Sequence, residues 1–259
     1  MCILFVALGE HPRYPLIVAA NRDEEFARPS ETAGFWDGSP DIYGGRDLQA
    51  GGTWLAVNKA GRIAAITNLR MPHLYKANAI SRGGLIPHYL NCESVTEFKE
   101  ELRNQYHLYN PFNLMFGSMS ELTVYNSATN TFVNLGQGFH SVSNGPVDDY
   151  WPKMSRGVSL LEEHVLERTD RDLDIDRLIG DMRDTTQADE TLLPQTGVGV
   201  EFEKQLSSIF IEGDSYGTRT TSVLTFDRQY LSFYEVNYDA AANSHNMSKQ
   251  LIELPLDGH

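Results

Sequence analysis

The chain has 259 residues, of which 21 are basic and 35 acidic, so its net charge is −14. Apolar residues make up 41% of the chain and charged residues 22%, a balance that excludes collagen-like, low-complexity and disulfide-scaffold proteins. The acidic excess argues against nucleic acid or an anionic membrane as a main partner, because both require a basic face.

The sequence predicts no membrane span. The apolar run near the start, Cys2–Leu8, is much shorter than the roughly 18 residues that cross a bilayer, and Glu10 follows soon after. No basic leader precedes it, so it does not resemble a secretory signal, and we expect a cytoplasmic protein. The mature chain would then begin at Met1 or, after methionine removal, at Cys2. With Cys92 as the second cysteine, at most one disulfide is possible.

Short β-rich runs dominate the chain and occur in pairs separated by turn residues. The predicted strands are Cys2–Leu8, Pro15–Ala20, Thr53–Val57, Arg62–Thr67, Phe112–Gly117, Glu121–Tyr125, Thr131–Leu135, Ser208–Glu212, Thr218–Phe226 and Tyr230–Asn237.

Helical patterns are fewer and lie between these groups. Ser94 and Glu97 have capping-box spacing at the start of one helix, and Asp149 is a candidate cap for a helix with Pro152 in its first turn. Two shorter helices are predicted over 84–90 and 175–182. Hairpins in clusters, with helices between the clusters, favour an α+β fold, and the absence of a repeat or a long linker favours one domain over residues 1–259.

The most informative segment is Asn21-Arg22-Asp23-Glu24, which directly follows an apolar strand. If the first two strands form a hairpin, the end of the second returns beside the start of the first, and Asp23 lies near Cys2. A cysteine at the mature terminus carries its own base, since an α-amine near pKa 7.7–8.0 can accept the proton of a thiol near 8.5. The alternative is that Cys2 is a small apolar residue opening a buried strand.

Several spaced motifs resemble the NRDE family, which includes the transport and Golgi organisation protein 2 group. They stand in the family's order over nearly the whole chain, and they are Met1-Cys2-Ile3, the Asn21–Glu24 tetrad, Arg28-Pro29, 51–55, Thr67-Asn68, Ser143-Asn144, Trp151-Pro152 and 216–220.

That family is in turn similar to cysteine-type N-terminal nucleophile hydrolases, such as penicillin V acylases and conjugated bile acid hydrolases. The resemblance implies a four-layer αββα sandwich of antiparallel sheets. Position by position, it implies Cys2 as nucleophile, Asp23 beside its amine, Asn68 and Asn144 as oxyanion donors, and Arg219 as a late active-site arginine. The acylases carry Arg, Asn, any residue and Asp at the tetrad, whereas Asn21 and Arg22 precede Asp23 here.

Each of these positions also has a structural interpretation. Asn68 can simply end a strand, Asn144 precedes the turn sequence Gly145-Pro146, and Arg219 can be a strand-edge charge. The residues Asn21, Arg22, Glu24 and Trp54 are candidate binding residues, although Trp54 also suits a core or a pocket wall.

No metal or cofactor site is predicted. The segment 162–190 holds eleven acidic and four basic residues, but it lacks the glycine and glutamate positions of a calcium loop and suits a solvated surface. The glycine pairs fit neither dinucleotide nor Walker motifs, and the histidines have no zinc-site spacing.

Two functions from different classes are consistent with the sequence. The first is a hydrolase or acyltransferase in which Cys2 attacks an amide, thioester or related acyl group. The second is a non-catalytic carrier on the same fold for a hydrophobic ligand such as haem, acyl-coenzyme A or lipid. Haem would need an axial ligand, and Met71, His73 and His88 are candidates by residue type. In both cases the partner is a small molecule, and the sequence does not fix the oligomeric state.

Overall fold

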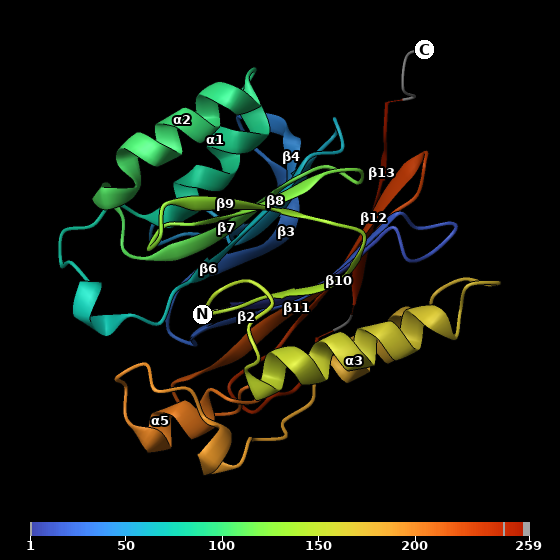
Figure 1. Ribbon diagram of the computed structural model, residues 1–259. Helices are drawn as coiled ribbons and strands as arrows, with labels where there is room; N and C mark the ends of the chain where they lie inside the picture. The colour runs from blue at the N-terminus through green and yellow to red at the C-terminus, as the bar shows by residue number, and fades with distance from the viewer. Residues whose placement is uncertain (1, 246, 256–259) are drawn as a thin grey trace.

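A computed structural model describes residues 2–245 and 247–255 of the chain, in which two antiparallel sheets pack face to face between two layers of helices (Figure 1). The first sheet has the strand order β10-β1-β2-β11-β12-β13. Its strands are β1 (Cys2–Leu8), β2 (Leu16–Glu25), β10 (Gly138–Val142), β11 (Tyr216–Phe226), β12 (Tyr230–Asn237) and β13 (Ser248–Glu253).

The second sheet runs from β3 to β9 in chain order, each strand pairing with the next. Its strands are β3 (Ser30–Trp36), β4 (Ser39–Asp47), β5 (Leu55–Asn58), β6 (Ile63–Asn68), β7 (Phe112–Gly117), β8 (Leu122–Asn126) and β9 (Thr131–Leu135). Some of its connections are short turns, as at Gly61, whose φ of +78° suits glycine at the β5–β6 hairpin. The connection from β6 to β7 is long and contains the helices that cover this sheet.

Helices cover the outer face of each sheet (Figure 1). The helices α1 (Leu85–Asn91) and α2 (Val95–Gln105) pack on the second sheet, whereas α3 (Pro152–Leu166) and α4 (Ile175–Asp181) pack on the first. The remaining helical elements are α5 (Val200–Gln205) and the 3-10 turns η1 (Pro72–Leu74), η2 (Arg82–Gly84), η3 (Tyr106–Leu108) and η4 (Glu190–Leu192). The predicted four-layer αββα sandwich is therefore confirmed. In the part of the chain that is described, no helix has the length and apolarity to cross a membrane.

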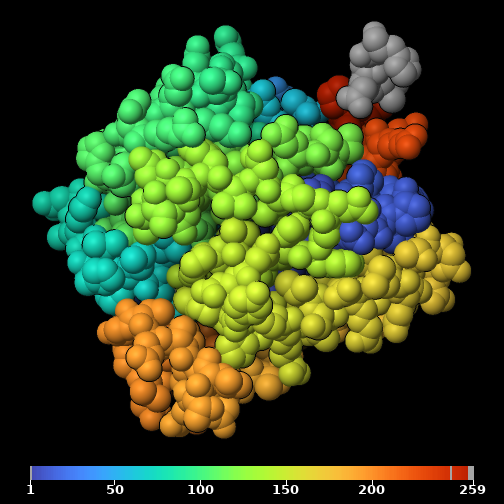
Figure 2. Space-filling view, in the orientation of Figure 1, coloured from blue at the N-terminus to red at the C-terminus, as the bar shows by residue number. Residues whose placement is uncertain are grey.

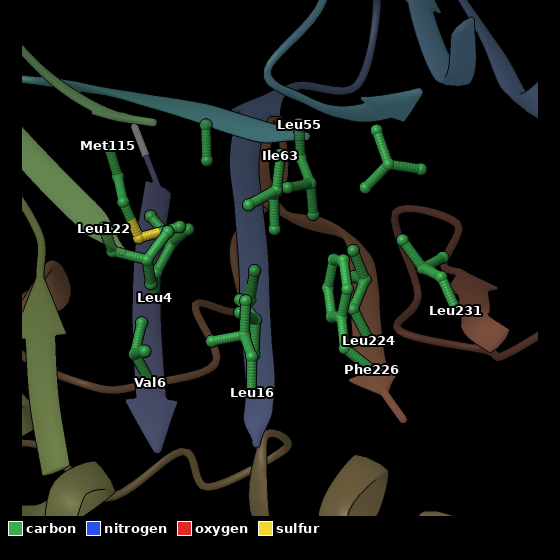
Figure 3. Packing of buried hydrophobic residues seen from close by; sticks show 14 of the residues in the cluster. Leu4, Val6, Leu16, Leu55, Ile63, Met115, Leu122, Leu224, Phe226 and Leu231 are labelled. Atoms are coloured by element: carbon green, nitrogen blue, oxygen red, sulfur yellow. The ribbon is translucent and has the colours of Figure 1, made fainter. Parts of the chain in front are cut away.

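Both faces of strand β1 are buried, which explains why its sequence is apolar without alternation. Successive side chains of a strand point to opposite faces of its sheet. Leu4 and Val6 enter the core between the sheets, whereas Ile3 and Phe5 pack on the helix layer beside α3. The inter-sheet core is seen in Figure 3, where the side chains of β1, β2 and β11 meet those of the opposing sheet.

Most predicted elements are present, with shifted ends. Ser94 caps α2 by accepting from the Glu97 amide, and the predicted strand Tyr230–Asn237 has the bounds of β12. The helix predicted over 175–182 is α4, which Asp174 caps.

Three expectations are wrong. The segment Ser208–Glu212 is not a strand: its apolar side chains are buried, but its backbone bonds to separate partners, such as the Asp184 carbonyl, rather than to a ladder. The N-cap of α3 is Trp151 and not Asp149, and no side chain caps it. Finally, β2 does not end at Ala20 but continues through the whole tetrad, because β1 and β11 supply pairing partners to that point.

Candidate active site

A cavity of about 250 Å³ opens where the first residue of β1 meets the last residues of β2. Cys2, Arg22, Asp23 and Glu24 line it from the first sheet, and Trp54 and Asn68 line it from the second. The other lining residues come from the turns around these strands and include Arg28, Asp47, Thr53, Ile80, Arg82 and Asn110. The cavity is thus built at the shared edge of both sheets.

The strand register determines how these side chains are presented. Cys2 pairs with Arg22 across β1 and β2, so both side chains project from the face that meets the second sheet. Asp23, the next residue, projects from the face that carries α3. The residue paired with Cys2 is therefore Arg22, and Asp23 reaches the same cavity at the edge of the sheet from the opposite face.

Asp23 is a buried carboxylate with 1% of its surface exposed. Its Oδ1 accepts a hydrogen bond from the Thr218 hydroxyl on β11 at 2.7 Å. Burial raises the pKa of Asp23, while the cations Lys153 and Arg70 act in the opposite direction. A buried carboxyl is harder to ionise than an exposed one, so the charged form of Asp23 depends on these nearby cations.

The Cys2 thiol has a pKa above that of a free cysteine. Burial raises the pKa of Cys2, and the carboxylates of Asp23 and Glu24 add to the rise, while Arg22 opposes it. The thiol is therefore predominantly protonated at neutral pH, and it needs a base before it can act as a nucleophile.

Arg22 and Trp54 form one wall of the cavity. Arg22 is 4% exposed, and its guanidinium carbon lies 4.2 Å from the centroid of the Trp54 ring. Such a cation–π contact holds the guanidinium in place, and Nη1 has no hydrogen-bond partner among the residues that the structure describes. Glu24, on the rim, lies 3.8 Å from Arg28, which in turn bonds to Asp47 at 2.6 Å.

The two predicted oxyanion asparagines have different environments. Asn68, the last residue of β6, is half-buried and lines the cavity. Asn144 is 2% exposed and is not among the lining residues; its Nδ2 donates to the Asn68 carbonyl at 2.9 Å. Asn144 therefore joins the site through Asn68.

Two further predicted residues do not reach the cavity. Asn21 bonds through its amide nitrogen to the carbonyls of Met182 and Ile209 and through its oxygen to Thr221, so it ties β2 to the helix layer. Arg219, at a bulge of β11, donates to the carbonyls of Glu25 and Arg28 and holds the turn after β2.

Sequence reasoning missed a buried polar group next to Asn144. It consists of Lys153 in the first turn of α3, Arg70 after β6 and Glu203 on α5, and Arg70 and Glu203 form an ion pair. Lys153 directly follows the motif Trp151-Pro152, which is the one signal that pointed to this region. The other two residues come from segments that only the tertiary fold brings together.

The candidate haem ligands are not gathered around the cavity. Met71, His73 and His88 are absent from its lining, and His88 lies on α1 at 3.3 Å from Glu101. Across residues 2–245 and 247–255, no group of three or more His, Cys, Asp or Glu residues is placed to hold a metal ion.

The fold matches solved structures of N-terminal nucleophile hydrolases. A mutant conjugated bile acid hydrolase from Clostridium perfringens superposes with a TM-score of 0.53 over 100% of this chain and 94% of its own, at 12% identity. A second variant of that enzyme gives a TM-score of 0.52. At this identity the likeness establishes the class of fold.

The family model for Transport and Golgi organisation 2 matches residues 1–240, and the chain belongs to that family. The Transport and Golgi organization protein 2 homologs of Bos taurus and Homo sapiens are each 32% identical over 248 residues, covering 88% of this chain and 89% of theirs. The Drosophila melanogaster protein is 26% identical over 259 residues.

Proposed function

We propose that the protein is an N-terminal-cysteine hydrolase or acyltransferase that acts on an amide, thioester or related acyl bond. The observation that supports this most directly is the single cavity lined by Cys2, Asp23 and Asn68, at the start of β1 and the ends of β2 and β6. These are a nucleophile, a carboxylate and an amide donor, the groups that acyl transfer requires.

In the proposed reaction Met1 is removed and the α-amine of Cys2 accepts the thiol proton; Met1 lies outside the described residues. The thiolate attacks the acyl carbon, a carbon–sulfur bond forms, and the leaving amine or thiol departs with the proton that the α-amine returns. Water then cleaves the thioester, releases a carboxylic acid and restores the thiol. Asp23 holds the ammonium form of the amine in place.

The developing oxyanion would be received by Asn68. Its side chain is half-buried at the cavity, so a donor there acts where water is partly excluded. Asn144 donates a hydrogen bond to the Asn68 carbonyl and thereby helps to hold Asn68 in place. The substrate's acyl group would then lie against Trp54, whose ring is already held by Arg22.

The test compares wild type with Cys2→Ala and Cys2→Ser on three probes: decanoyl-4-nitroanilide, the decanoyl thioester of N-acetylcysteamine, and haem. We expect release of nitroaniline or thiol from wild type, a decanoyl adduct on Cys2 by intact mass, and loss of both in the Ala variant. Intact mass of the purified protein also reports whether Met1 is removed.

Cys92→Ala serves as the matched control, because that thiol does not line the cavity and contacts Arg62 at 3.6 Å. It should keep the wild-type turnover. Saturable haem or thioester binding that is equal in wild type and Cys2→Ala, with no product and no adduct, would favour a carrier and contradict the proposal.

A further inference from the structure

Lys153 is an unusual lysine because it is buried at a position that disfavours its positive charge. It is 3% exposed and occupies the second position of α3, after Trp151 as N-cap and Pro152. A helix N-terminus carries a partial positive charge and disfavours cations. Lysine is rarely buried unless it is paired with an acid, and no ion pair of Lys153 with a carboxylate occurs within the described part of the chain.

The charged and titratable groups that act on Lys153 come from four segments. They are Cys2 on β1, Asp23 on β2, Arg70 after β6 and Glu203 on α5. Burial lowers the pKa of Lys153 to about 7, and Arg70 contributes, while Asp23 and Cys2 oppose the change. An apolar side chain of similar length would avoid the free-energy cost of burying a charged group here, so stability of the fold does not account for a lysine at this position.

The geometry shows what Lys153 contacts. Its Nζ donates to Oδ1 of Asn144 at 3.2 Å, and the Nδ2 of the same amide donates to the Asn68 carbonyl at 2.9 Å. The Oδ1 also accepts from Ser143 and from Arg70. Because all these donors converge on the oxygen, the amide of Asn144 can adopt only the orientation with its nitrogen toward Asn68.

We propose that Lys153 is a positioning residue of the active site: through Asn144 it fixes the oxyanion donor Asn68, and its ammonium balances the Asp23 carboxylate and the Cys2 thiolate. This inference rests on the proposed function for its catalytic readout, whereas its effect on the thiol can be measured without any substrate. Arg70 makes a longer bond of 3.4 Å to the same oxygen through Nη2, while its Nη1 is paired with Glu203.

The first measurement is a double-mutant cycle on decanoyl-thioester turnover with Lys153→Met, Asn144→Ala and the double variant. Loss of one positioning bond is expected to lower kcat by about a hundredfold with little change in KM, because misplacement of about 1 Å has effects of that size. Turnover is measured at pH 8.5, where the Lys153 amine is largely neutral and its effect through the bond to Asn144 remains. If Lys153 positions Asn68 through Asn144, the double variant is then no slower than Asn144→Ala. Multiplying losses would contradict the proposal.

The second measurement is the rate of Cys2 alkylation by iodoacetamide between pH 6 and pH 9, with Cys92 as internal reference. Below pH 7 the ammonium of Lys153 favours the thiolate, so wild type should react about tenfold faster than Lys153→Met, the effect of one pKa unit. Above pH 8 the amine is neutral and the two rates converge. Lys153→Arg keeps its charge and should keep the advantage at every pH.

The two readouts separate the possible failures. If no probe is turned over but the alkylation ratio falls with pH, the proposed function fails and the charge role of Lys153 stands. A ratio that is independent of pH contradicts the inference, even where turnover is normal. Thermal unfolding checks folding of each variant, and Lys59→Met, at an exposed turn lysine, should match wild type in both measurements.

Discussion

At the scale of single residues, the cavity depends on charges that burial makes unfavourable. Asp23 and Arg22 are adjacent in β2, both are nearly inaccessible, and they face opposite sides of the sheet. Protein interiors tolerate such groups when hydrogen bonds and opposite charges surround them, as Thr218 and Lys153 do for Asp23. A site that keeps such groups exchanges stability for reactivity.

Replacing Asp23 with Asn tests this exchange. Burial raises the pKa of Asp23 above that of the unfolded chain, so its ionisation destabilises the fold as pH rises through that range. Asp23→Asn should therefore raise the free energy of unfolding at pH 7, by about 1.4 kcal/mol for each unit of the pKa difference, and have little effect below pH 4. Turnover should fall.

Calorimetry at pH 3.5 and pH 7 measures this, with Asp170→Asn as the exposed control at 87% side-chain exposure. If Asp23→Asn instead lowers the free energy of unfolding at pH 7 more than at pH 3.5, the Asp23 carboxylate is stabilised mainly by favourable charge pairing.

At the scale of elements, α3 lies close to β1 because it contains a glycine at the contact. A Cβ added to Gly157 would lie 1.9 Å from Cζ of Phe5. This close approach brings the first turn of α3, with Lys153, to the level of Asn144. The close contact at Gly157 thereby sets the position of Lys153, which lies about one turn earlier in the same helix.

Gly157→Ala should therefore destabilise the protein by about 1–3 kcal/mol, the usual effect of overpacking, although alanine favours a helix. The matched control is Gly180→Ala on α4, where an added Cβ meets nothing within 4 Å. It should raise the free energy of unfolding by about 0.5–1 kcal/mol. Chemical denaturation of both variants measures the difference, and equal effects would contradict the close contact.

At the scale of the whole molecule, the cavity exists because two sheets meet through an apolar core and separate at one edge. The core includes Leu4, Leu224 and Phe226 from the first sheet and Leu55 and Met115 from the second (Figure 3). On the surface, the segment around α5 (orange) lies beside the segment around η1 (cyan) in Figure 2, and an added Cβ at Gly197 would be 3.8 Å from Pro72. These two segments hold Glu203 and Arg70 in the interior.

Leu224→Ala should cost about 2–5 kcal/mol of unfolding free energy, because a fully buried leucine leaves a cavity between rigid sheets. Leu251→Ala, on β13 of the same sheet and 49% exposed, should change it by less than about 0.5 kcal/mol. Urea denaturation of both variants checks this, and similar losses would mean that the sheets pack less tightly than the structure indicates.

The sequence by itself determined the α+β class, most strands and the segment that bears the cavity. Apolar runs and turn residues act locally, so they locate β1, β2 and the β5–β6 hairpin without knowledge of the fold. The motifs identified Cys2, Asp23 and Asn68, which meet at one cavity. Four strands were missed, β3, β4, β10 and β13, because they lie partly or largely at the surface, where apolar periodicity is weak.

Only the tertiary structure decided which polar residues of the motifs face the cavity. Asn21 and Arg219 belong to the same set of motifs as Asp23, yet both donate hydrogen bonds to backbone carbonyls of neighbouring segments. Lys153 and Glu203 carry no local pattern, because their partners are distant in sequence. Burial and pairing depend on which segments come together in space, and those contacts set the charge and the reactivity of the site.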